Sequence, residues 1–215
     1  GARIFSQSSE CLENGKVQDF SCLRNKCMAY CENDWVLYID SDETTSFGLV
    51  EENSKVVSGR LRYDAYRVPA GIIVDGRRII YSSNYPGYQI RFFKKSSGIF
   101  KKPVHERFIM SRLSEIGKFR NPWHYYVDFK KAYDDFVSDI PRDMELYRKR
   151  YQGKSFFKRA RGAFVALRTI AAVIIKSAAN YLIHGFKDSY PPKLELLRIL
   201  YQFEIIKTIL WRITR

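Results

Sequence analysis

The apolar positions of the first half of the chain switch between helical and strand spacing. Residues 19–32, DFSCLRNKCMAYCE, place Phe20 and Leu23 on one face, which predicts a helix. The next segment, WVLYID at 35–40, is a continuous apolar run rich in β-forming residues, which predicts a buried strand. A weaker alternation at 2–7 predicts a short strand near the start of the chain.

More strands are expected after a short helical stretch that follows Glu43. Segment 60–80 alternates and contains Asp-Gly at 75–76, a dipeptide that favours a hairpin turn between AGIIV and RRIIY. The segments at 88–100 and 104–108 indicate further strands. Strands and helices that alternate in this way predict an α/β sheet with mixed strand directions.

The second half of the chain follows helical spacing. The predicted helices cover 124–150, 155–184 and 191–213. Pro191 and Pro192 separate the last two, where prolines commonly begin a helix. We therefore predict two domains, an α/β region at 1–115 and a mainly helical, basic region at 116–215.

The charge of the chain is unevenly distributed. The 215 residues carry a net charge of +14 and are 46% hydrophobic, a composition that excludes a disordered chain. Residues 91–215 hold 27 basic and 11 acidic residues, whereas residues 1–90 hold 10 and 12. Such an excess suits a polyanionic partner, namely an anionic membrane face, a phosphorylated glycolipid or nucleic acid.

The predicted helix at 155–184 combines apolar and basic positions. Lys154, Lys158, Arg161 and Arg168 form a stripe along one face. A basic residue near the middle of a membrane-spanning helix is unfavourable. A basic stripe beside an apolar face instead favours a helix that lies in the membrane interface. A core helix with a solvated charged face is the alternative interpretation.

All four cysteines, Cys11, Cys22, Cys27 and Cys31, occur early in the chain. Their spacing lacks the C-x-x-C pairs of common zinc sites. We therefore expect reduced, half-buried thiols of a cytosolic protein rather than a metal or iron–sulfur site.

The predicted strand at 35–40 runs directly into the acidic stretch DSDE, which contains Asp40, Asp42 and Glu43. Ligands bind at the carboxyl ends of strands in open α/β sheets. In an extended chain Asp40 and Asp42 point to the same side and can face one divalent cation. The motif alone supports equally well a helix N-cap followed by acids in the first turn.

Several longer segments share one family resemblance. RNKCMAYCENDWVLYIDSDE resembles the central segment of bacterial family 2 glycosyltransferases, which have the GT-A nucleotide-sugar fold. YPGYQIRFFKKSSGIFKKPVHERF is similar to a stretch of the subgroup that includes lipopolysaccharide core β-glucosyltransferases. NPWHYY and YLIHGFKDSYPPKLELLRILYQFEIIKTILW match its C-terminal pattern. The resemblance implies a partial GT-A (Rossmann-like) mixed sheet followed by a mainly helical C-terminal region.

The resemblance implies a donor site around the D-x-D motif. Asp40 and Asp42 match that motif, so they would contact Mg²⁺ or Mn²⁺ and the diphosphate of a nucleotide-sugar donor. Arg24 and Asn25 match the helix on the nucleotide side, where they would contact the nucleotide or brace the loop. Gln89 belongs to the matching Q-x-R motif.

The resemblance also implies catalytic roles. Glu106 would be the general base that removes a proton from the acceptor hydroxyl, and His105 would touch metal or phosphate. Arg91 would stabilise the charge of the leaving diphosphate. Structural ion pairs are the alternative interpretation for Arg91 and Glu106.

Two departures from the family pattern affect these expectations. The family's first two strands, which hold the nucleotide base and ribose, have no counterpart in these 215 residues. We therefore expect this chain alone to be inactive and to bind a nucleotide sugar poorly. Ser189 replaces a glycine of the family's C-terminal turn, so that turn is expected to have a different backbone conformation.

The expected activity is inverting, metal-assisted sugar transfer to a lipid-linked or lipopolysaccharide-type glycan, for the bacterial cell envelope. The acceptor and the basic helices would place the protein at the inner face of the cytoplasmic membrane as a peripheral protein. Other acceptors, such as a polyprenyl phosphate or a capsular repeat unit, remain open. The alternative function is a non-catalytic basic module that binds anionic membrane or nucleic acid, although no nucleic-acid motif is present and we expect no such partner.

Overall fold

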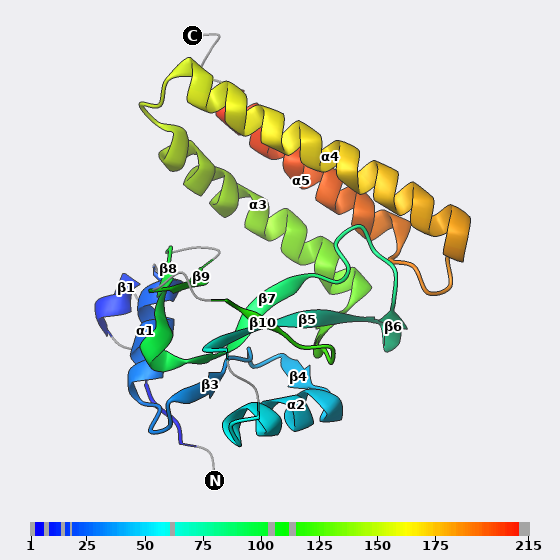
Figure 1. Cartoon of the computed structure of the whole chain (residues 1–215). Coiled ribbons are helices and arrows are strands. Elements are labelled where there is room, and N and C mark those ends of the chain that lie inside the picture. The colour runs from blue at the N-terminus through cyan, green and yellow to red at the C-terminus, as the bar shows by residue number, and fades with distance from the viewer. Residues whose placement is uncertain are drawn as a thin grey trace. The chain divides into compact units, whose positions relative to one another are not determined.

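The chain contains an α/β part with a mixed sheet and a helical C-terminal region, as the sequence predicts (Figure 1). A computed structural model describes residues 3–6, 9–13, 16–17, 19–60, 63–102, 106–111 and 115–210. Two compact units emerge, a sheet unit (1–70 and 88–124) and a helical unit (71–87 and 125–215). The domain boundary near residue 115 stays a prediction.

The sheet unit holds two helices and most of the strands. The helices are α1 (Phe20–Ala29) and α2 (Phe47–Val57). The strands are β3 (Trp35–Leu37), β4 (Glu43–Thr45), β7 (Tyr88–Lys94), β8 (Gly98–Lys101), β9 (Arg107–Met110) and β10 (Gly117–Lys118). Three short elements precede α1, namely η1 (Ser9–Cys11), β1 (Leu12–Glu13) and β2 (Lys16–Val17), and η2 (Lys95–Ser97) precedes β8. Strands β5 (Ala65–Val74) and β11 (Trp123–Val127) each continue from this unit into the helical unit.

The main sheet has the strand order β3-β7-β5-β11-β4, and β10 and β6 (Arg77–Ile79) also pair with β5. β7 lies antiparallel between β3 and β5, whereas β10 runs parallel to β5. The prediction of mixed strand directions is therefore confirmed. β8 and β9 form a separate antiparallel pair, with Phe100 opposite Phe108.

The core of the sheet unit forms where α1 meets β7, β8 and β9. Met28 of α1 packs with Ala65, Phe93, Phe100 and Phe108, all of them buried. The rings of Phe93 and Phe108 stack with their centres 3.7 Å apart, which fixes the β8–β9 pair against the main sheet.

The start of α1 is fixed by a cap and a covalent bond. The Asp19 side chain accepts a hydrogen bond from the backbone N–H of Cys22 at 2.9 Å, an N-cap that ends the preceding loop. Cys22 is joined to Cys11 by a disulfide, whereas Cys27 and Cys31 are free. The expectation of four reduced thiols is therefore wrong for Cys11 and Cys22, because the loop before α1 brings them together.

The helical unit begins with the predicted hairpin. Ile72 of β5 lies opposite Ile79 of β6, and Asp75 and Gly76 form the turn with φ values of 48° and 78°. Glycine adopts such left-handed values at no steric cost, and Asp is among the residues that tolerate them. The hairpin prediction is confirmed.

Three long helices follow, α3 (Phe129–Tyr151), α4 (Phe156–His184) and α5 (Pro192–Leu210). Helix α5 packs against both α3 and α4, and one buried cluster contains Met144 from α3, Ala166 from α4, and Ile205 and Ile209 from α5. The predictions for α4 and α5 are confirmed, up to Leu210 for α5, beyond which the predicted helix lies outside the described residues.

Three local predictions are wrong. Residues 124–127 belong to strand β11 and not to a helix, which begins only at Phe129. The strand predicted at 35–40 ends at Leu37, and residues 38–40 are irregular and lead into the turn at 41–42. Residues 3–6 have no regular structure, and the rest of the strand predicted at 2–7 lies outside the described residues.

Candidate functional site

A tight turn follows β3 and holds the acidic stretch. The backbone N–H of Glu43 donates to the carbonyl of Asp40 at 3.1 Å, and the Glu43 carboxylate accepts from the backbone N–H of Asp40 at 2.9 Å. Asp40 and Asp42 therefore belong to a turn and not to the extended chain that would align their side chains. Asp42 is exposed and makes no ion pair with any residue that the structure describes.

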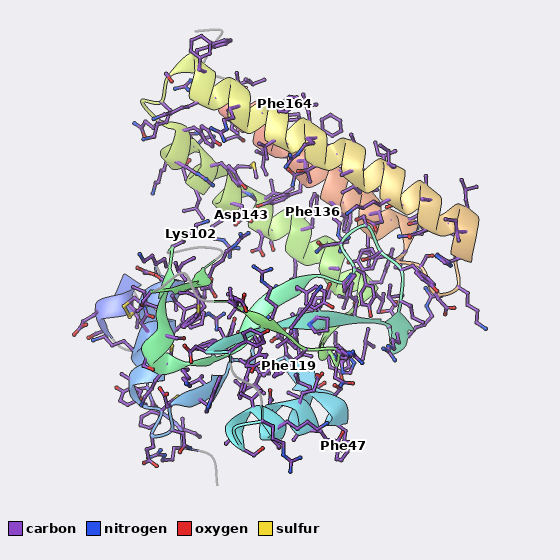
Figure 2. All side chains as sticks on the ribbon, in the orientation of Figure 1. Phe47, Lys102, Phe119, Phe136, Asp143 and Phe164 are labelled. Carbon is purple, nitrogen blue, oxygen red and sulfur yellow. A yellow bond between two sulfur atoms is a disulfide. The ribbon has the colours of Figure 1, made fainter. Side chains whose placement is uncertain are left out.

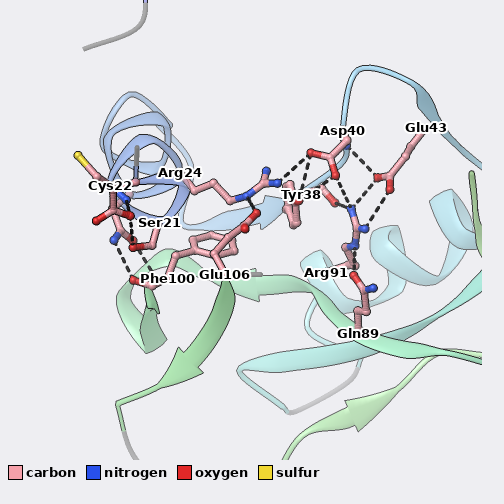
Figure 3. Close-up of polar contacts among 12 residues, drawn as sticks. Ser21, Cys22, Arg24, Tyr38, Asp40, Glu43, Gln89, Arg91, Phe100 and Glu106 are labelled. Carbon is pink, nitrogen blue, oxygen red and sulfur yellow. Dashed lines mark hydrogen bonds and ion pairs between the residues drawn. The ribbon is translucent and has the colours of Figure 1, made fainter. Parts of the chain in front are cut away.

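Arg24 on α1 links two carboxylates that are distant in the sequence (Figure 3). Its Nη2 donates to Asp40 Oδ1 at 3.1 Å, and its Nε donates to Glu106 Oε1. Burial on its own would lower the pKa of Arg24, but the hydrogen bond to Glu106 and the charges of its neighbours outweigh burial and raise the pKa. Arg24 thus stays a cation between Asp40 and Glu106.

Arg91 on β7 supports the same turn from the other side. Its guanidinium pairs with both carboxylate oxygens of Glu43, at 2.6 Å and 3.0 Å, and lies 3.9 Å from Asp40 Oδ2. Its Nε donates to Gln89 Oε1 at 3.0 Å. Arg91 is only 3% exposed, so in this arrangement it holds the turn. This ion pair agrees with the alternative interpretation for Arg91, and its role at the leaving diphosphate stays a prediction.

Tyr38 lies between the two arginines, as Figure 3 shows. The guanidinium carbons of Arg24 and Arg91 are 3.9 Å and 4.4 Å from its ring centre. The Tyr38 hydroxyl donates to Asp40, with oxygens at 2.9 Å and 3.1 Å. Burial raises the pKa of Tyr38 far above its ordinary value, so the hydroxyl remains a donor. Trp123 stacks on the other side of Arg91, at 3.9 Å.

The acidic turn is therefore stabilised by arginines from two other elements. Like charges as close as Asp40 and Glu43 repel unless a cation lies between them. Arg91 meets both carboxylates and Arg24 meets Asp40 from α1. The described carboxylates of this cluster, Asp42 apart, are each paired with a guanidinium.

Most of the residues selected from the sequence lie in this cluster. It contains Arg24, Asp40, Gln89, Arg91 and Glu106. Asn25 points elsewhere: its amide exchanges two hydrogen bonds with the backbone of Phe100, at 2.9 Å and 3.0 Å, and so fixes β8 to α1. His105 lies outside the described residues.

Sequence reasoning missed three members of the cluster, Tyr38, Glu43 and Trp123. Glu43 is the last residue of DSDE, and its position three residues after Asp40 is the signal for a turn. Tyr38 is the only hydroxyl-bearing residue within the run WVLYID, which is unusual in a strand predicted to be buried. Trp123 has no comparable signal, because its contact depends on the sheet.

The donor set is compatible with a divalent cation that binds together with a phosphate ligand. Mg²⁺ usually takes one or two carboxylates and completes its shell with water and substrate phosphates. Asp42 is exposed and supplies one such carboxylate, whereas Asp40 would exchange its bonds to Arg24 and Tyr38 for the cation. Among the described residues, no group of three or more His, Cys, Asp or Glu side chains is arranged to hold a metal by itself.

No protein-family model and no curated protein matches this sequence. The family resemblance therefore rests on the motifs of the chain and on the way in which their residues come together.

Proposed function

We propose that the protein is an inverting glycosyltransferase whose sheet unit is part of a GT-A-type domain. One observation supports this proposal most strongly. The resemblance assigns Arg24 and Asp40 from one matching segment and Glu106 from another to one site, and Arg24 is hydrogen-bonded to both carboxylates. Gln89 and Arg91, from the same matching segment as Glu106, join the same cluster.

In the proposed donor site, Asp40 and Asp42 would hold Mg²⁺ or Mn²⁺ together with the diphosphate of a nucleotide sugar. The cation would supply Lewis-acid stabilisation of the leaving group. Arg24 lies beside Asp40, where it adds positive charge next to the diphosphate. Arg91 and Gln89 act as positioning residues, since Arg91 is buried against Glu43 and holds the turn that carries Asp40. His105 would touch metal or phosphate.

Glu106 is the proposed general base. The acceptor hydroxyl attacks the anomeric carbon, the bond from that carbon to the diphosphate breaks, and Glu106 takes the hydroxyl proton. One carboxylate oxygen, Oε1, is used by Arg24. The other, Oε2, has no hydrogen-bond partner among the described residues, so it is the oxygen offered to the acceptor.

The exposed face of α4 supports a membrane-bound acceptor. Phe157, Phe164, Ile175 and Leu182 recur close to whole helical turns and are between 65% and 86% exposed. Figure 2 labels Phe164 on α4. Arg161 lies beside this stripe and is exposed, as is Lys158 on the same helix. An apolar stripe flanked by cations suits the surface of an anionic membrane, so the acceptor would be a glycolipid or a lipid-linked glycan at the cytoplasmic face.

The test uses the full-length natural protein with Mg²⁺ or Mn²⁺ and a panel of nucleotide sugars, and it follows release of the nucleoside diphosphate. Asp42→Asn is expected to reduce turnover at least about a hundredfold while the fold is retained, because the exposed carboxylate is needed for the cation. Asp134→Asn removes an exposed carboxylate from α3 and serves as the matched control. Turnover that is unchanged in Asp42→Asn, or that persists without divalent cations, contradicts the metal role.

The second candidate function is a membrane-binding module without catalysis. It is favoured by the pairing of Asp40, Glu43 and Glu106 with arginines, an arrangement that also suits a purely structural cluster. Of the described helices, α4 is long and apolar enough to cross a membrane by length and composition, a test that buried helices of soluble proteins also pass. Co-flotation with anionic vesicles in the absence of any nucleotide-sugar turnover would support this candidate.

A further inference from the structure

The helical unit contains a cavity of about 590 Å³ that is separate from the arginine–carboxylate cluster. Its walls come from α3, α4 and α5 together with Ser83, Asn84 and Tyr190. The volume falls within the range of roughly 300–1,000 Å³ that is usual for small-molecule sites. All its walls belong to one unit, so the cavity belongs to the packing of the three helices.

Three cations line this cavity, Arg168 and Lys176 from α4 and Arg198 from α5, and no carboxylate does. Arg168 and Lys176 form no ion pair within the described part of the chain. Both side chains are exposed, so their charges are available to an anion that enters the cavity.

Arg198 is the best-anchored of the three cations. Its Nη1 donates to Ser83 Oγ at 2.9 Å and to Glu195 Oε2 at 3.2 Å, and its guanidinium lies 4.3 Å from the Tyr190 ring centre. Glu195 is itself buried and also accepts from the backbone N–H of Ser83 at 2.9 Å. Its single negative charge leaves an excess of positive charge around the cavity.

The rest of the wall is apolar. Phe136 of α3 (Figure 2), Val173 of α4, and Leu194 and Leu197 of α5 contribute hydrocarbon surface. A small inorganic anion would gain nothing from this surface, whereas a molecule with an acidic group and an apolar part would use both. We propose that this cavity binds the phosphate group of an amphiphile, with the phosphate at Arg168, Lys176 and Arg198 and the apolar part along α3 and α5.

The inference does not depend on sugar transfer. A phosphate-bearing amphiphile fits the cavity whether or not the sheet unit turns over a nucleotide sugar. The test below reads binding alone, so its failure and the failure of the proposed transferase activity are separate results.

The experiment is calorimetric titration of the full chain with three probes: dihexanoyl phosphatidic acid below its micelle concentration, dihexanoylglycerol and inorganic phosphate. Phosphatidic acid is expected to bind at least about tenfold more tightly than either of the others, because only it offers both groups. The double variant Arg168→Gln, Lys176→Gln is expected to weaken that binding about tenfold or more. The double variant Arg168→Lys, Lys176→Gln, which keeps a cation at position 168, is expected to bind more tightly than the first double variant.

The matched control is the double variant Lys158→Gln, Arg161→Gln. It removes the same charge from the same helix at exposed positions that do not line the cavity, so binding is expected to change less than about twofold. If both double variants lost affinity for phosphatidic acid equally, binding would depend only on the total charge of α4, and the proposal would be overturned. So would inorganic phosphate or dihexanoylglycerol binding as tightly as phosphatidic acid. Circular dichroism melts establish that all variants retain the helices.

Discussion

The paired arginines of the sheet unit and Arg168 of the helical unit are arranged in opposite ways. In the sheet unit, Arg91 is buried and bonded to both oxygens of Glu43, and Arg24 joins Asp40 to Glu106. In the helical unit, Arg168 lines a cavity without an acidic partner among the described residues. In the first arrangement each guanidinium is paired with carboxylates of the protein. In the second the guanidinium remains available to a ligand in the cavity.

This difference separates arginines that stabilise the fold from arginines that can bind a ligand. A guanidinium that is paired on all sides fixes the chain around it, and removing it exposes a buried carboxylate. A cation without a partner contributes little to folding, and its removal is mainly felt by whatever it binds. Stability measurements and binding measurements should therefore respond to different residues in the two units.

The largest expected effect is on stability in the sheet unit. Arg91→Met leaves the Glu43 carboxylate, 7% exposed, without its partner, which should lower the free energy of unfolding by about 3–5 kcal/mol. Urea unfolding followed by tryptophan fluorescence measures this loss, since Trp35 and Trp123 both belong to this unit. Arg67→Met, an exposed position on β5, is the control. A loss below about 1 kcal/mol would show that the pair is not structural.

A smaller effect is expected at Glu195, the buried carboxylate that is bonded to Arg198. Glu195→Gln keeps the shape of the side chain but loses its charge-assisted bonds to Ser83 and Arg198, which should cost about 1.5–3 kcal/mol of stability. Because the cavity becomes more positive, binding of phosphatidic acid should tighten severalfold. Glu204→Gln, in a surface pair with Lys207 on the same helix, should change stability by less than about 1 kcal/mol. Weaker binding in Glu195→Gln would mean that the cavity does not attract anions.

The smallest effect concerns alkaline pH. Burial raises the pKa of Tyr181 to about 12, and its hydroxyl donates to the carbonyl of Tyr190 at 2.8 Å. The folded state therefore keeps this proton where the unfolded chain, with an ordinary tyrosine pKa near 10, has lost it. Stability from this group is complete below about pH 10 and declines as the pH rises toward 12. Tyr181→Phe should reduce that decline in denaturant unfolding between pH 9 and about 11.5, and an unchanged slope would contradict the assignment.

Local patterns predicted the elements whose signals lie within a few residues. The turn at Asp75-Gly76 needs positive φ values, which this dipeptide favours. Helix α4 shows helical spacing of apolar residues over its whole length. Strand β11 was missed because Trp123–Val127 is a short aromatic run whose pairing partners lie elsewhere in the chain. Tertiary context decides such segments more than intrinsic preference does.

The candidate site shows the same limit. Family motifs selected Arg24, Asp40 and Glu106, but no local rule predicts that Arg24 bonds to a carboxylate 82 residues away. The bidentate pair of Arg91 with Glu43 was missed because it joins β7 to the turn after β3. The Cys11–Cys22 disulfide was missed because sequence spacing excludes zinc patterns better than it identifies pairs of thiols.

The position of Tyr38 has a consequence for how this protein can be observed. One ring is in contact with both guanidinium groups of the cluster, and its hydroxyl touches the carboxylate that the metal proposal requires. Any molecule that draws Asp40 away must change the surroundings of that single ring. The aromatic proton resonances of Tyr38 would therefore register occupancy of the turn before any product is formed, and Tyr38→Phe would keep the ring as a sensor while disconnecting it from Asp40.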